Sequence, residues 1–151
     1  KTILKASYIN VTMSEKKLGF LIGDLFYTYT NYLNNALKEM DITISQARVL
    51  LVLAKNDGVS IDFLANKTNI GKSSITKSVK ILEKKEFLTK EIDPDDNRKK
   101  IIKITSKGKE IQKFAIKTNE EIENKLNPQI GEKEMADLKI KLEELIILID
   151  S

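Results

Sequence analysis

The sequence predicts a mostly α-helical protein with one small β-hairpin. Apolar residues recur every three or four positions along most of the chain, which is typical of amphipathic helices. There are only two prolines, Pro94 and Pro128, so few helix breaks are expected. Between residues 87 and 105 the spacing changes to a loose alternation around a cluster of turn formers, which indicates a hairpin.

The composition excludes several classes of protein. A chain of 151 residues fits one domain with its own core. It has no cysteine and no histidine, which excludes disulfides, thiolate zinc sites, cysteine nucleophiles and histidine general bases. We therefore expect no enzyme, no metal and no cofactor. No apolar run reaches about 18 residues, so we expect a cytoplasmic protein without membrane contact.

The basic residues are concentrated in the middle of the chain. Residues 66–109 contain 13 basic and 6 acidic residues, a net of +7, whereas the whole chain carries only +4. A concentrated positive block is the electrostatic signature of a polyanionic partner such as nucleic acid. The same charge would also suit an ordinary solvated surface, since 24 of the 26 basic residues are lysines.

The first expected helix runs from Ser14 to about Met40, and Ser14 with Glu15 forms its start signal. Met13, just before it, is a candidate native start of the chain. Such a helix of roughly 25 residues is nearly 40 Å long, more than one small core requires. We therefore expect part of its apolar stripe to face another chain.

Three shorter helices are expected next. Thr43 and Gln46 have the spacing of a capping box at the start of the second helix, which ends at residues 56–58. The third and fourth helices cover about 60–67 and 72–85. Two short helices joined by a tight turn make a helix-turn-helix candidate.

The hairpin is expected to follow directly, with strands at 87–92 and 100–105 and a polar tip between them. Lys90 and the lysines of residues 100–103 should project from it. A helix-turn-helix followed by a hairpin is a winged helix-turn-helix. Its fourth helix would enter the major groove of DNA, and its wing would reach the adjacent backbone or minor groove.

Two long helices complete the chain, one from residue 105 or 106 to about Leu126 and one over 132–149. Asn127 and Pro128 are expected to separate them. The last helix has heptad-like apolar spacing. We expect residues 1–40 to contain an N-terminal segment and a dimerisation helix, residues 41–108 a winged helix-turn-helix DNA-binding domain, and residues 109–151 the C-terminal dimerisation helices. These parts form one compact chain and not independent domains, and two such chains form a homodimer.

The candidate DNA contacts are hydroxyl and cationic side chains on the fourth helix and the wing. Arg98, at the wing tip, suits a narrow minor groove, and Asp96 could pair with it and set its orientation. The full set is Lys72, Ser73, Ser74, Thr76, Lys77, Lys80, Lys90, Asp96, Arg98, Lys99 and Lys100. For a small ligand the only candidates are Tyr27, Tyr29 and Tyr32 in the first helix, which could equally be core or interface residues.

Residues 43–110 resemble the multiple-antibiotic-resistance regulator (MarR) family. The resemblance rests on the joint order of several short pieces: Ile42-Thr43 with Gln46 and Leu50, Leu64-Ala65, Ser73 to Lys77 with Val79, Leu82 to Lys85, Asp93-Pro94, Asp96, Arg98, Ile104-Thr105 and Lys107-Gly108. It implies a bacterial homodimeric repressor that binds a pseudo-palindromic double-stranded DNA operator. It also implies release by a small phenolic or anionic effector bound between the dimer helices and the winged domain.

The chain departs from the family pattern at several positions. Glu86 stands where the family usually has glycine, and Lys90 where it has arginine, which keeps the charge but loses bidentate geometry. Lys80-Ile81 replaces a frequent aspartate-arginine pair, so the family's base preference does not transfer.

Two other classes of function stay open. One is a helical dimer that acts as a protein-interaction adaptor and has lost DNA binding. The basic residues of the fourth helix and wing argue against it, because an adaptor would not need them. An enzyme is the other, and it would have to use carboxylates such as Asp93, Asp95 and Asp96, which we expect to be solvated at an exposed tip.

Overall fold

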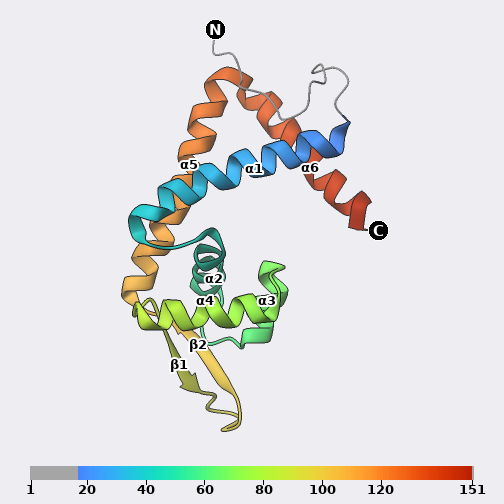
Figure 1. The fold of residues 1–151 in the computed structure, drawn as a ribbon. Coiled ribbons are helices and arrows are strands. Elements are labelled where there is room, and N and C mark those ends of the chain that lie inside the picture. Colours follow the sequence, from blue (N-terminus) through green and yellow to red (C-terminus); the bar gives the residue numbers. More distant parts are fainter. Residues whose placement is uncertain (1–16, 151) are drawn as a thin grey trace.

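The computed structural model describes residues 17–150 and is shown in Figure 1. Met13 and the expected start of the first helix at Ser14 and Glu15 lie outside these residues. The elements, in chain order, are α1 (Leu18–Leu37), a 3-10 turn η1 (Lys38–Met40), α2 (Ile44–Lys55), α3 (Ile61–Thr68), α4 (Lys72–Lys84), β1 (Leu88–Ile92), β2 (Lys100–Ile104), α5 (Ser106–Ile130) and α6 (Glu132–Asp150). The predicted mostly α fold with one hairpin is confirmed.

Local sequence signals start the short helices where they were expected. The Thr43 hydroxyl accepts the Gln46 N–H at 3.3 Å, and the Gln46 side chain accepts the Thr43 N–H at 3.1 Å, so the capping box is formed. Ser60 caps α3 by accepting the Phe63 N–H at 3.2 Å. Asn69 then adopts a left-handed conformation (φ 54°) in the turn that leads to α4.

The core of the winged unit is built from α2, α3, α4 and the hairpin. Fully buried side chains from each of these elements meet in it: Leu50, Leu53, Leu64, Ile75, Leu82, Leu88 and Ile102. The hairpin is antiparallel, with Leu88 opposite Ile104 and Ile92 opposite Lys100. A bridge between Val59 and Ile102 ties its inner strand to the segment before α3. The core therefore fixes the base of the hairpin and leaves its tip exposed.

The end of α5 differs from the prediction. Asn127 and Pro128 do not interrupt the helix, which continues through Pro128 to Ile130. Proline has no backbone N–H to donate, so Pro128 removes one hydrogen bond near the end of the helix. The other hydrogen bonds of the helix are kept. The chain turns instead at Gly131, whose φ of 97° favours glycine.

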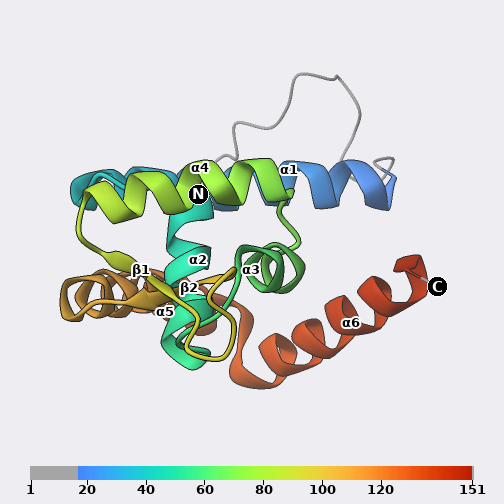
Figure 2. The ribbon, with the colours of Figure 1, turned by 90° about the horizontal axis from the view of Figure 1, so that it is seen from below.

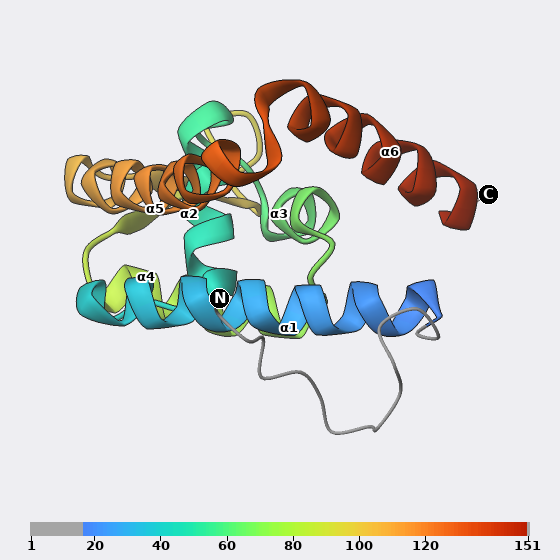
Figure 3. The ribbon, with the colours of Figure 1, turned by 90° about the horizontal axis from the view of Figure 1, so that it is seen from above.

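Helices α1 and α6 lie towards the end of the molecule away from the hairpin, and α5 runs from the hairpin to that end (Figure 1). Helix α1 packs on the middle of α5, while α6 folds back from the end of α5 and runs apart from α1, drawing nearer to it towards the C-terminal end (Figures 2 and 3). Large apolar side chains of α1 and α6 are consequently exposed, among them Phe20, Leu25, Phe26, Ile140, Leu142 and Ile146. None of the helices within residues 17–150 is long and apolar enough to cross a membrane.

Candidate nucleic-acid interface

Helix α4 has two clearly different faces. Ile75, Val79 and Leu82 are completely buried and hold the helix on the core. The opposite face is exposed and carries only polar and cationic side chains along its first two and a half turns: Lys72, Ser73, Ser74, Lys77 and Lys80. The helix is therefore fixed by its apolar side and presents hydroxyls and ammonium groups to solvent.

Two of the predicted contact residues on α4 already have partners. The Lys72 ammonium lies 2.6 Å from Asp62 of α3, although both side chains are largely exposed, so the pair contributes little to stability. The Thr76 hydroxyl donates to the Lys72 carbonyl at 2.8 Å. Gly71, at the N-cap, offers no side-chain cap, so the first backbone N–H groups of α4 are left for solvent or an anion.

The wing tip is ordered by its own carboxylates. Asp96 accepts the backbone N–H of Arg98 at 3.1 Å and forms an ion pair with Lys99 at 3.2 Å. Asp93 accepts the Asp95 N–H at 2.9 Å. Asp96 therefore contacts the backbone of Arg98 and not its side chain as expected: its ion pair is with Lys99, and the Arg98 guanidinium is exposed at the tip.

The lysines of the hairpin do not all project from it, contrary to the prediction. Lys90 turns to Glu83 of α4, with 2.6 Å between ammonium and carboxylate. Lys103 pairs with Glu91 at 2.8 Å across the hairpin, and the pKa of Lys103 is raised by this hydrogen bond. The cations of the block that have no acidic partner among residues 17–150 include Lys77, Lys80, Arg98 and Lys100, and all four are exposed.

The three tyrosines do not come together as one site. The Tyr29 hydroxyl donates to the Asn119 side chain of α5, and Tyr32 accepts from Lys125 at 2.9 Å. Burial, and after it the negative charge of Glu123, raise the pKa of Tyr29. Tyr27 is exposed, two residues and about 200° around the helix from Tyr29. Tyr29 and Tyr32 therefore form part of the α1–α5 contact.

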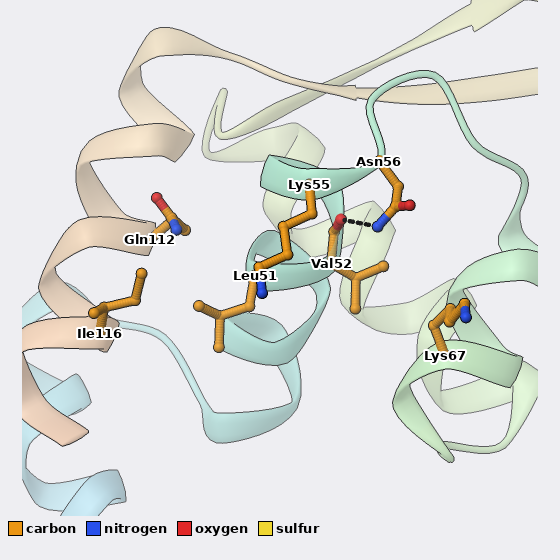
Figure 4. Close-up of a pocket in the computed structure, with 7 residues that line it drawn as sticks. All are labelled: Leu51, Val52, Lys55, Asn56, Lys67, Gln112 and Ile116. Carbon is orange, nitrogen blue, oxygen red and sulfur yellow. Dashed lines mark hydrogen bonds between the residues drawn. The ribbon is translucent and has the colours of Figure 1, made fainter. Parts of the chain in front are cut away.

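A groove that the sequence did not indicate lies between α2, α3 and α5 (Figure 4). Its volume is about 470 Å³, and its lining is Leu51, Val52, Lys55, Asn56, Lys67, Gln112 and Ile116. The Asn56 side chain is held by a hydrogen bond to the Val52 carbonyl at 3.1 Å. These residues are up to 65 positions apart in the sequence, so only the tertiary fold brings them together.

No group of three or more carboxylates within residues 17–150 is arranged to hold a metal ion. Of the tip carboxylates that were the candidates for an enzyme, those of Asp93 and Asp96 accept backbone N–H groups of the turn, and Asp96 also pairs with Lys99.

Comparison with known proteins gives consistent relatives. The MarR family model matches residues 42–100. The HTH-type transcriptional regulator SarZ of Staphylococcus saprophyticus is 29% identical over 136 residues, which are 87% of this chain and 89% of that protein. SarZ of Staphylococcus aureus is 27% identical over 135 residues, 87% of either chain.

Solved structures show the same fold. The transcriptional regulator SlyA superposes with a TM-score of 0.78 at 20% identity, covering 89% of this chain and 94% of SlyA. MepR of S. aureus in a DNA complex gives a TM-score of 0.76 at 21% identity, covering 88% and 96% of the two chains.

The helix-turn-helix, the hairpin that follows it and the exposed cationic face of α4 define a winged helix-turn-helix protein. The family match and the SarZ relatives narrow this class further. Residues 42–100, which contain the winged helix-turn-helix, match the MarR family, a family of transcriptional regulators, and over 87% of its length the chain is similar to the SarZ transcriptional regulators.

Proposed function

We propose that the protein binds an operator in double-stranded DNA as a homodimer, represses transcription by occupying it and is released by a small effector. The observation that carries this proposal is the set of exposed cations on α4 and at the wing tip that have no acidic partner among residues 17–150. Figure 1 places both elements at the end of the molecule away from the α5–α6 junction. A helix and a wing so placed can contact adjacent grooves of one duplex.

The proposed contacts divide by element. On α4, Lys77 and Lys80 would neutralise phosphates beside the major groove, and Ser73 and Ser74 would reach phosphate or base edges. Arg98 would enter the minor groove, with Asp96 fixing its backbone. Lys72, Thr76, Lys99 and Lys100 complete the set; Lys90, whose ammonium is held by Glu83, is left out of it.

The homodimer is supported by the exposed apolar side chains of α1 and α6. Phe20, Leu25, Phe26 and Ile146 are each more than half exposed. Exposed large apolar side chains in such number are typical of an interface, and a two-fold dimer buries the same face of both copies. Two copies would also present two copies of α4, as a pseudo-palindromic operator requires.

For the effector, the groove between α2, α3 and α5 fits better than the tyrosines. Leu51, Val52 and Ile116 supply an apolar lining, while Lys55 and Lys67 supply positive charge. This combination suits a small anionic molecule with an apolar or phenolic body. The hydroxyls of Tyr29 and Tyr32, in contrast, already have partners on α5.

Fluorescence anisotropy tests the proposal. The protein is titrated against duplex DNA from upstream of its own gene and against a scrambled duplex, over a series of salt concentrations. We expect sequence-selective binding whose affinity falls steeply with salt, by a slope of about −0.9 for each phosphate neutralised. Binding that ignores sequence, both here and in genome-wide selection of sites, would favour the adaptor alternative.

A further inference from the structure

Lys90 is set apart from the other cations of the wing by its surroundings. It lies in the middle of β1, opposite Ile102, which is buried. Only 20% of its side chain is exposed, against 68% for Lys99 at the tip. Its ammonium lies 2.6 Å from the Glu83 carboxylate, so the side chain bridges from the hairpin to α4, the recognition helix of the proposed DNA binding.

Glu83 is the single acidic residue of α4. A free carboxylate on a helix that approaches phosphates would repel them. Pairing with Lys90 neutralises this charge and at the same time removes the Lys90 ammonium from the cations available to DNA.

The last turn of α4 is held on its other side as well. The Lys85 ammonium contacts both the backbone carbonyl and, at 2.7 Å, the carboxylate of Asp41, in the corner between η1 and α2. The end of the recognition helix is thus tied to the hairpin by one residue and to the helical corner by another. Lys77 and Lys80, earlier in the same helix, have no such ties in the part of the chain that the structure describes.

We propose that Glu83 and Lys90 are a positioning pair that fixes the wing relative to the recognition helix, so that Lys90 acts through Glu83 and is not itself a phosphate contact. The inference rests on the proposed DNA binding. The helix in one groove and the wing in the next groove contact the same duplex. Once the first contact is made, the second adds to the affinity only when the distance between helix and wing matches the distance between the two grooves. An ion pair of this exposure adds little to overall stability, but it restricts the hairpin to one arrangement.

Four variants test the pair: Lys90→Met, Glu83→Gln, the double variant, and the exchanged pair Glu83→Lys with Lys90→Glu. We expect each single variant to lower the preference for operator over scrambled DNA by about tenfold, and the double variant to be no worse than either single one, because both remove one interaction. The exchanged pair should recover most of the preference. Lys90→Met should leave the salt slope of binding unchanged.

Lys77→Met is the matched control, since Lys77 is an exposed lysine without an acidic partner in the described part of the chain. It should reduce the salt slope by about 1. If Lys90→Met reduces the slope in the same way while Glu83→Gln leaves the preference intact, Lys90 is a direct phosphate contact and the inference is wrong. Additive single effects, or an exchanged pair that recovers nothing, would also overturn it.

Amide hydrogen exchange in the free protein separates this result from a failure of the proposed function. Breaking the pair should speed exchange in residues 88–104, and the exchanged pair should slow it again. If exchange responds in this way but the unmodified protein selects no DNA, the proposed function fails and the wing remains fixed by the pair. If exchange does not respond, the positioning role fails whatever the DNA result.

Discussion

Gly108, in the first turn of α5, lies directly against the backbone carbonyl of Phe87, where the chain passes from α4 into β1. A β-carbon on Gly108 would overlap the Phe87 carbonyl oxygen and would come within 2.9 Å of the Ile104 side chain. The same carbonyl accepts the Thr105 N–H at 3.1 Å, and the Thr105 hydroxyl accepts the Gly108 N–H at 3.0 Å. This contact joins the winged unit to the long helix that leads to α6.

Gly108→Ala should therefore destabilise the protein by about 3 kcal/mol or more, because the obstructing atoms belong to the backbone and to a buried side chain and cannot move aside. The free energy of unfolding from urea denaturation measures the loss. Gly19→Ala is the control: Gly19 lies in a helix, a β-carbon there would meet nothing within 4 Å among residues 17–150, and the change should leave stability unchanged or slightly higher. A Gly108→Ala protein as stable as the control would show that the turn is not tightly packed.

Glu86 ends α4 in a left-handed conformation, with a φ of 63°. Only glycine adopts this conformation without steric cost, so Glu86→Gly should stabilise the protein by about 1 kcal/mol. The ion pair that is lost, with Lys107 at 3.4 Å, is exposed and contributes little. Glu86→Ala separates the two effects, because it removes the ion pair but keeps the β-carbon. We expect that control to change the urea midpoint very little, and an equal gain in both variants would refute the conformational explanation.

The sequence predicted the winged unit well because its signals are local. The Thr43–Gln46 capping box, the Ser60 cap and the turn residues of the hairpin act over three to five positions, and each is formed. Pro128 misled the prediction because a proline removes only one backbone hydrogen bond and need not end a helix, and here the helix ends two residues later at Ile130. Glu86 shows the opposite case, in which the fold imposes a backbone conformation that the residue itself disfavours.

The candidate site was less accessible to sequence reasoning. A lysine looks the same in a sequence whether it is free or paired, and only the tertiary structure shows that Lys90 meets Glu83 while Lys77 stays exposed. The groove could not be found either, since Lys55 and Lys67 line it from different helices and Gln112 from a third.

Arg98→Ala should weaken operator binding by about 1–3 kcal/mol, because the exposed guanidinium at the wing tip can fit a narrow, electronegative minor groove. Arg98→Lys keeps the charge and should recover only part of the loss, since an ammonium is more strongly hydrated and lacks the planar fork. Anisotropy titrations of both variants at one salt concentration measure the effect. Circular dichroism confirms folding, and unchanged affinity in a folded Arg98→Ala protein would remove Arg98 from the interface.

The dimer proposal gives a prediction on α6. Leu142 belongs to the heptad-like stripe with Leu138 and Leu145, whereas Ile140 lies about 200° around the helix from it, on nearly the opposite side. Both side chains are exposed in the single chain, 37% for Leu142 and 54% for Ile140. If the stripe is the dimer interface, Leu142→Glu buries an unpaired charge there and should raise the dimer dissociation constant about 100-fold. Ile140→Glu should leave it unchanged.

Analytical ultracentrifugation over a concentration series measures both dissociation constants, and operator binding should weaken in the Leu142→Glu protein alone, because a monomer contacts one half-site. Equal dissociation by the two variants would mean that α6 is enclosed on both sides. A Leu142→Glu protein that stays dimeric would place the interface on α1, whose exposed Phe20 and Leu25 would then be the next residues to charge. A wild-type chain that is monomeric at every concentration would rule out the homodimer.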